Sequence, residues 1–219
     1  MKKLIYNKID KALINDLPLV TFPGLIEVVD LQRKVGKAVR YLLSQPILGI
    51  DTETRPSFRK GTCHKVSLLQ VSTHDICFLF RLNILGFFPA IKRLLEDETV
   101  PKVGLSLHDD VHALSKLGPF KPGNFIDLQD KVKEIGIEDM SLQKIYANLF
   151  GEKISKSQRL TNWEANELSK GQKIYAATDA WSCIMIYEEL LDLERTDDYE
   201  LVKVEADAGK EEDVQERLP

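Results

Sequence analysis

Hydrophobic and polar positions change their period several times along the first part of the chain. Residues 25–30 (LIEVVD) form a short apolar run that predicts a strand, and the apolar residues of 31–45 recur at helical spacing. Pro46 ends that helix, and the apolar run ILGID at 47–51 is typical of a buried strand. A strand, a helix and a second strand are therefore expected in this order.

The rest of the chain continues with a hairpin and then with alternating elements. Two strand-like runs, 65–73 and 76–82, flank the short connection His74-Asp75, which predicts a β-hairpin. Further strands are expected at 100–106 and 125–129, and helices at 89–98, at 107–117, around Val132 and Ile135, at 141–151 and from Ser169 to Tyr187. A hairpin that leads into alternating strands and helices predicts an α/β domain, with a mixed central sheet flanked by helices.

Charge suggests three regions along the chain. The 219 residues carry a net charge of −4, but eleven acids and four bases from 192 to 219 contribute −7, which leaves +3 on the remainder. This acidic end contains few apolar residues and therefore predicts disorder. We expect an N-terminal extension at 1–24, one folded domain at 25–191, and an acidic, disordered tail at 192–219. A mildly basic body is compatible with a phosphate-rich substrate.

Composition narrows the expected cellular setting. The chain lacks an apolar run of membrane-spanning length, and its first residues lack the apolar region and cleavage site of a secretory signal. Its three cysteines have neither disulfide-framework nor metal-ligand spacing, which fits a reducing compartment. We therefore expect a cytoplasmic protein that does not contact a membrane.

Four carboxylates and a tyrosine form the candidate chemistry. Asp51 and Glu53 are two apart on an expected strand and share a face, and Tyr175 and Asp179 are four apart on an expected helix. Asp110 lies in the first turns of a different helix. Oxygen-rich clusters of this kind suit Mg²⁺ or Mn²⁺, whereas zinc prefers nitrogen and sulfur. Two such ions can activate a water and stabilise the departing alkoxide at phosphorus.

Simpler interpretations exist for each part of this pattern taken alone. Asp109 and Asp110 near a helix start would ordinarily complement the helix dipole, and either could be the site aspartate. A strand-end acid pair is commonly solvated. His108 and His112 have the spacing of a zinc pair, but the sequence shows no third ligand for them.

Taken jointly, the residues resemble a known family. The stretches IDTET (50–54), KVGLSLHDDVHAL (102–114) and QKIYAATDAWSCIMIY (172–187) resemble the three motifs of DEDD 3′–5′ exonucleases of the tyrosine-bearing (DEDDy) subgroup. KSQRLTNW (156–163) resembles a stretch of the branch that contains the Werner helicase exonuclease domain. Ribonuclease D and polymerase proofreading domains are more distant members. The resemblance covers about 25–191 and implies a ribonuclease H-like fold.

The resemblance also implies a role for each motif residue. Asp51, Glu53 and Asp179 would hold the cation that carries the attacking water. Asp51 would bridge to a second cation supported by Asp110, which the motif alignment favours over its neighbour. Tyr175 would orient the water rather than act as a full base, because a tyrosine pKa near 10 is high for that task.

Three further residues are candidates for substrate contact. Lys156 and Arg159 would contact the nucleic-acid backbone, although both could also be solvated loop cations. Trp163 could stack on a base, although a Trp just before a helix is more often a packing anchor.

The expected function is metal-dependent hydrolysis of phosphodiester bonds from a single-stranded 3′ end, using two Mg²⁺ or Mn²⁺ ions. DNA is favoured over RNA because the chain has no room for the additional helical domains of ribonuclease D. RNA 3′ trimming of the ribonuclease D kind, or a catalytically silent nucleic-acid-binding protein on the same fold, are the alternatives. No protein partner is indicated.

Overall fold

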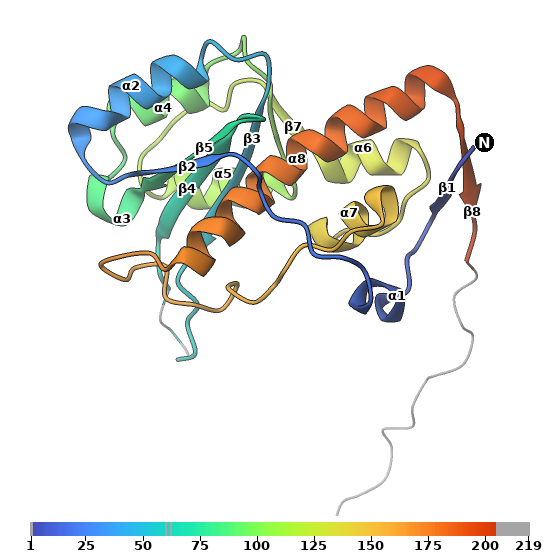
Figure 1. Cartoon of the computed structure of the whole chain (residues 1–219). Coiled ribbons are helices and arrows are strands. Elements are labelled where there is room, and N and C mark those ends of the chain that lie inside the picture. The colour runs from blue at the N-terminus through green and yellow to red at the C-terminus, as the bar shows by residue number, and fades with distance from the viewer. Residues whose placement is uncertain (1, 60, 62, 205–219) are drawn as a thin grey trace, which may run out of the picture.

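A mixed β-sheet forms the centre of the molecule in the computed structural model, which describes residues 2–59, 61 and 63–204 (Figure 1). Within those residues six strands follow the spatial order β2-β5-β4-β3-β6-β7. Their bounds are β2 Leu25–Val29, β3 Leu48–Thr54, β4 Val66–Ser72, β5 Ile76–Arg81, β6 Lys102–Gly104 and β7 Phe125–Asp127. The expected strands are thus all present.

The sheet combines an antiparallel centre with parallel edges. Strand β4 is antiparallel to both β3 and β5, and the turn between β4 and β5 lies at the predicted His74-Asp75 connection. Strands β2, β6 and β7 join by parallel pairing. Parallel neighbours need crossover connections, and helices provide them. The predicted α/β fold with a mixed sheet is therefore confirmed.

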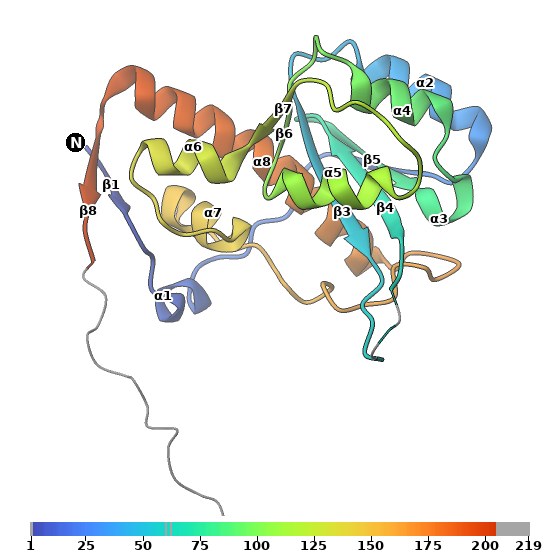
Figure 2. The same cartoon turned by 180° about the vertical axis from the view of Figure 1, so that it is seen from behind.

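Helices cover both faces of this sheet (Figures 1 and 2). On one face, α2 (Gln32–Leu42), α4 (Pro89–Glu96) and α5 (Leu107–Ser115) pack with the sheet in one apolar cluster. On the other face lie α6 (Leu128–Glu134), α7 (Leu142–Phe150) and α8 (Lys170–Thr196), which form a second cluster. The short helix α3 (Leu82–Leu85) directly follows β5. The functional residues lie where these layers meet.

The two ends of the described chain pair with each other. Strand β1 (Lys3–Tyr6) is parallel to β8 (Tyr199–Val202), and α1 (Lys11–Asn15) follows β1. Helix α8 continues past residue 191, where we expected the folded domain to end, so the ordered chain includes part of the expected tail. Residues 205–219 of that tail lie outside the described residues. Strands of four residues carry little periodicity, and their partners here are almost the whole chain apart.

Helix α8 is the longest element, and charged residues interrupt its apolar positions. Among the described residues, no helix combines the length and the apolar character needed to cross a membrane.

Candidate active site

Strand β3 carries the first two carboxylates of the site. Asp51 and Glu53 project toward the face of the sheet that α8 covers, and Glu53 is only 9% exposed. Carboxylate oxygens of Asp51, Glu53 and Asp179 all lie within 4.8 Å of one another. Residues from two distant parts of the chain therefore converge on one point, whereas their spacing predicted only that the members of each pair share a face.

Close packing of α8 against β3 makes this convergence possible. The helix begins at a capping box, in which Ser169 and Gln172 bond to each other's backbone N–H groups as the sequence predicted. A Cβ atom at Gly49 would lie 1.9 Å from the carbonyl oxygen of Ala180, so any side chain larger than hydrogen would push the helix away. Gly49 thus brings the helix backbone close enough for Asp179 to meet Asp51.

Asp110 approaches the site from α5, on the other side of β3. The carboxylate of Asp127 fixes the start of α5 by accepting hydrogen bonds from the backbone N–H groups of Ser106 (3.1 Å) and Leu107 (2.7 Å). Asp110 then accepts a hydrogen bond of 2.5 Å from the Thr52 hydroxyl. By contrast the Asp109 side chain is 89% exposed. The structure therefore directs Asp110, and not its neighbour, toward β3.

All four carboxyl groups have raised pKa values, chiefly because burial penalises the charged form. Burial and the neighbouring Asp179 raise the pKa of Asp51 to about 8. Burial and the charges of the other three acids raise the pKa of Glu53 to about 10. The pKa of Asp110 is raised to about 8 by burial and by Asp51, and that of Asp179 to about 7 by burial. Mutual repulsion of this kind is relieved when a cation binds between the carboxylates.

The donor set fits divalent cations. It consists of carboxylate oxygens alone, which suits hard ions such as Mg²⁺ or Mn²⁺. Within the described part of the chain, His108 and His112 do not belong to a cluster of this kind, so a zinc site there gains no support. Asp51, Glu53 and Asp179 would hold one ion.

Two supporting residues were not identified from the sequence. Gln70 lies opposite Asp51 on β4 and donates a hydrogen bond of 2.7 Å from Nε2 to Asp51 Oδ2. Gln70 is fully buried, and its Oε1 atom has no hydrogen-bond partner. The signal for Gln70 was a polar residue within the buried run VSLLQVS. Thr52, which holds Asp110, gave no comparable signal because it was expected to face away from the acids.

Tyr175 lies one helical turn before Asp179. Burial raises the pKa of the Tyr175 phenol above its ordinary value, and the charges of Asp179 and Glu53 raise it further. The hydroxyl group therefore stays protonated, and its hydrogen bond to Asp179 lowers the pKa of that carboxyl. A protonated phenol can orient a water but cannot remove its proton at neutral pH.

The three candidate substrate residues fall into two groups. Lys156 and Arg159 are exposed, and their positive charges stabilise the nearby carboxylates. The charge of Lys156 lowers the pKa of Asp179, and that of Arg159 lowers the pKa of Glu53, in both cases against the larger effect of burial. Trp163 is completely buried, with its ring 6.0 Å from that of Tyr175. A ring without exposed surface cannot stack on a base, so Trp163 has the packing role instead.

A ribonuclease H-like fold with four gathered carboxylates and a nearby tyrosine defines the class of DEDD nucleases. The chain belongs to the 3′-5′ exonuclease family, because the sequence model of that family matches residues 26–193.

Comparison with curated relatives and solved structures supports this assignment. The chain is 30% identical over 193 residues to the mouse (Mus musculus) bifunctional 3′-5′ exonuclease/ATP-dependent helicase WRN, covering 83% of the chain and 14% of that relative. It is 29% identical to ribonuclease D of Gluconacetobacter diazotrophicus (80% of the chain, 44% of the relative) and 26% identical to DNA polymerase I of Aquifex aeolicus (84% and 29%). The chain thus spans less than half the length of each.

Among solved structures, the Nibbler EXO domain of Aedes aegypti shares the fold. Its TM-score is 0.73 at 22% identity, with 80% of this chain and 93% of that one covered.

Proposed function

We propose that this chain is a metal-dependent exonuclease that removes nucleoside 5′-monophosphates from the 3′ end of nucleic acid. One observation carries the proposal: Asp51, Glu53 and Asp179, from β3 and α8, place carboxylate oxygens within 4.8 Å of one another beside a protonated tyrosine. Family membership supports the direction of cleavage.

The protein groups divide the work of hydrolysis between them. Asp51, Glu53 and Asp179 would hold one cation, and Asp110 together with Asp51 would hold a second. Such ions, when bound, supply an activated water and neutralise the charge on the leaving oxygen. Tyr175 orients the attacking water through its hydroxyl group. Gln70 fixes one Asp51 oxygen through its 2.7 Å hydrogen bond, which would keep the carboxylate in one orientation for holding a cation.

The preferred substrate is part of the proposal. The loop before α8 carries two positively charged side chains, Lys156 and Arg159, beside the acids. Such side chains suit the phosphate backbone of a single-stranded 3′ end. DNA as the favoured strand is supported by the likeness to a DNA polymerase I. RNA trimming is the second candidate, supported by the likeness to a ribonuclease D.

A cleavage assay tests the proposal directly. The protein is incubated with 5′-labelled single- and double-stranded DNA and RNA in Mg²⁺ or Mn²⁺, beside Asp51→Ala and Asp110→Ala variants. We expect a ladder that shortens from the 3′ end with wild type and disappears with chelator or with either variant. Asp109→Ala, which removes an exposed neighbouring carboxylate, is the matched control and keeps full activity. If wild type binds nucleic acid but shortens none of the four substrates, the protein is a silent binding protein and the proposal is wrong.

A further inference from the structure

The side chain of Glu164 joins two loops that flank the carboxylates. Its Oε2 atom accepts a hydrogen bond of 3.1 Å from Nη1 of Arg55, and its Oε1 atom lies 3.0 Å from Nδ1 of His64. The Glu164 side chain is 29% exposed, so both contacts are partly shielded from solvent. Arg55 and His64 belong to the connection between β3 and β4, whereas Glu164 lies just before α8.

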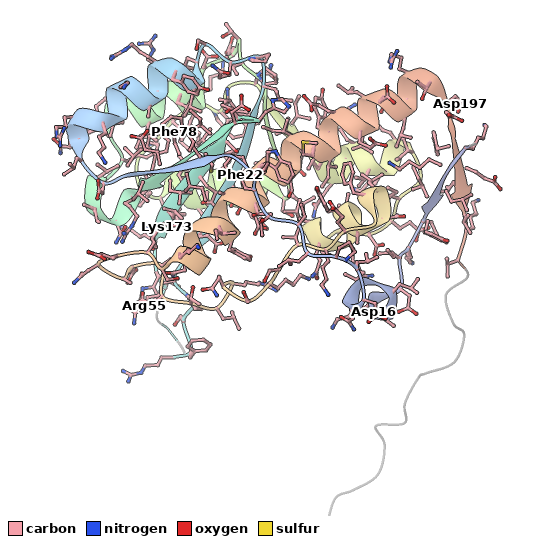
Figure 3. The ribbon with its side chains drawn as sticks, in the orientation of Figure 1. Asp16, Phe22, Arg55, Phe78, Lys173 and Asp197 are labelled. Atoms are coloured by element: carbon pink, nitrogen blue, oxygen red, sulfur yellow. The ribbon has the colours of Figure 1, made fainter. Side chains whose placement is uncertain are left out.

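The connection between β3 and β4 leaves directly from the site. Arg55 follows Glu53 by two residues and immediately follows the end of β3. Beyond it, Phe58 is 81% exposed and Arg59 is also exposed. Arg55 lies at the same end of the domain as Lys173, in the first turns of α8 (Figure 3). This loop therefore presents positive charge and an aromatic ring to solvent, starting two residues after Glu53.

The segment that precedes α8 is fixed by hydrogen bonds to the first turn of that helix. Gln172 Nε2 donates hydrogen bonds to Thr161 Oγ1 (3.0 Å) and to the carbonyl oxygen of Asn162 (3.2 Å). Trp163 packs beside Tyr175, and Arg159 acts on the pKa of Glu53. Glu164 is the next residue after this buried Trp, so its position is set by α8.

We propose that Glu164 is a positioning residue, which sets the separation between the cationic loop after β3 and the cationic segment before α8. The inference rests on the proposed function, because the polymer strand enters between these two loops. The backbone phosphates then meet Arg59 on one side and Lys156 and Arg159 on the other. When Glu164 is replaced by a neutral residue, the loop after β3 loses its ionic contacts with the segment before α8, and the strand binds less tightly.

A purely structural role for Glu164 predicts that its loss lowers the melting temperature and reduces activity on every substrate equally. The proposal predicts a different result. Ion pairs that keep contact with solvent contribute little to folding stability, and both contacts of Glu164 are only partly shielded, so we expect their loss to leave the fold intact. Loss of the ion pair weakens the binding of a polymer that spans both loops. Binding of a mononucleotide substrate, which occupies the carboxylate site alone, stays unchanged.

The experiment compares these two substrates. For Glu164→Gln we expect the KM for a single-stranded oligonucleotide to rise about fivefold, a change that corresponds to roughly 1 kcal/mol, while kcat stays within about twofold. Hydrolysis of the p-nitrophenyl ester of thymidine 5′-monophosphate stays unchanged, and so does the melting temperature. Glu188→Gln is the matched control, because Glu188 also pairs with a histidine, His74 at 3.0 Å, farther along α8. Its KM equals that of wild type.

A double-mutant cycle then tests whether Glu164 acts through Arg55. If Glu164 acts through Arg55, then Arg55→Gln combined with Glu164→Gln raises KM no further than Glu164→Gln does. An unchanged KM in Glu164→Gln overturns the proposal, as does an equal loss on both substrates together with a lower melting temperature. Because wild type is assayed in parallel, its failure to cleave any strand contradicts the proposed function rather than the role of Glu164.

Discussion

Gln70 donates a hydrogen bond of 2.7 Å to Asp51 from the position directly opposite on the neighbouring strand. The bond lowers the pKa of Asp51 against the much larger effect of burial, which raises it to about 8. Gln70 therefore favours the charged carboxylate that a cation requires, and it fixes which oxygen of Asp51 faces the site.

We expect Gln70→Leu to weaken cation binding while the fold is retained. A leucine has a similar size but no donor, so Asp51 becomes harder to ionise and freer to rotate. Loss of such supporting contacts commonly costs 10–100-fold in metal affinity. The measurement is the Mn²⁺ concentration that gives half-maximal cleavage, which should rise about tenfold. Gln45→Leu, in a partly buried glutamine after α2, is the control. An unchanged Mn²⁺ requirement would show that Gln70 has no part in the site.

The raised pKa values predict how the metal-free protein responds to pH. The pKa values of Asp51, Asp110 and Asp179 rise from near 4 to about 7 or 8 on folding, and that of Glu53 rises from 4.5 to about 10. Between the ordinary and the raised values the folded protein binds more protons than the unfolded chain. The contribution of these groups to the free energy of unfolding therefore falls as pH rises through that window.

Thermal unfolding in chelator checks this sign. The melting temperature should be lower at pH 8.5 than at pH 6, and Mn²⁺ should raise it more at the higher pH, because the ion binds the charged carboxylates. The Asp51→Asn variant removes one of the repelling charges, so its melting temperature in chelator should exceed that of wild type at pH 8.5. A variant that melts at the wild-type temperature there would contradict the electrostatic argument.

Tyr175→Phe should slow the chemical step without disturbing binding. The variant keeps the ring that packs beside Trp163 and loses the hydroxyl group that faces Asp179. We expect kcat to fall by roughly 10²-fold, in the range typical of positioned proton-transfer and orienting groups, with KM and Mn²⁺ requirement nearly unchanged. Tyr187→Phe, three turns farther along α8 and half-buried, is the matched control. Wild-type kcat in Tyr175→Phe would remove the phenol from the mechanism.

Trp163 provides a test that separates packing from base stacking. Because the side chain is completely buried, Trp163→Ala should lower the free energy of unfolding by about 3–5 kcal/mol. Trp163→Phe should cost much less and should leave oligonucleotide affinity unchanged. Urea denaturation and fluorescence anisotropy measure the two quantities. A large loss of affinity in Trp163→Phe with normal stability would restore the stacking role.

The sequence by itself predicted the fold class and, through its resemblance to the exonuclease motifs, the five motif residues. Strand and helix periods are local properties, so the face shared by Asp51 and Glu53, and that shared by Tyr175 and Asp179, could be predicted from spacing. The capping box at Ser169 is equally local, and the structure has it where expected. Local spacing therefore predicted each of these two pairs, which are the two halves of the site.

Tertiary structure decided what joins those halves. Gln70 reaches Asp51 from the neighbouring strand, and Thr52 on β3 reaches Asp110 on the helix that covers that face of the sheet, and the packing that brings them there depends on the whole core. The burial of Trp163 and the pairing of β1 with β8 depend on residues far away in the chain. Glu164 was not singled out from the sequence, and only the folded chain places it against Arg55 and His64. Contacts between distant segments leave no period in the sequence, because they follow from which surfaces the folded core brings together.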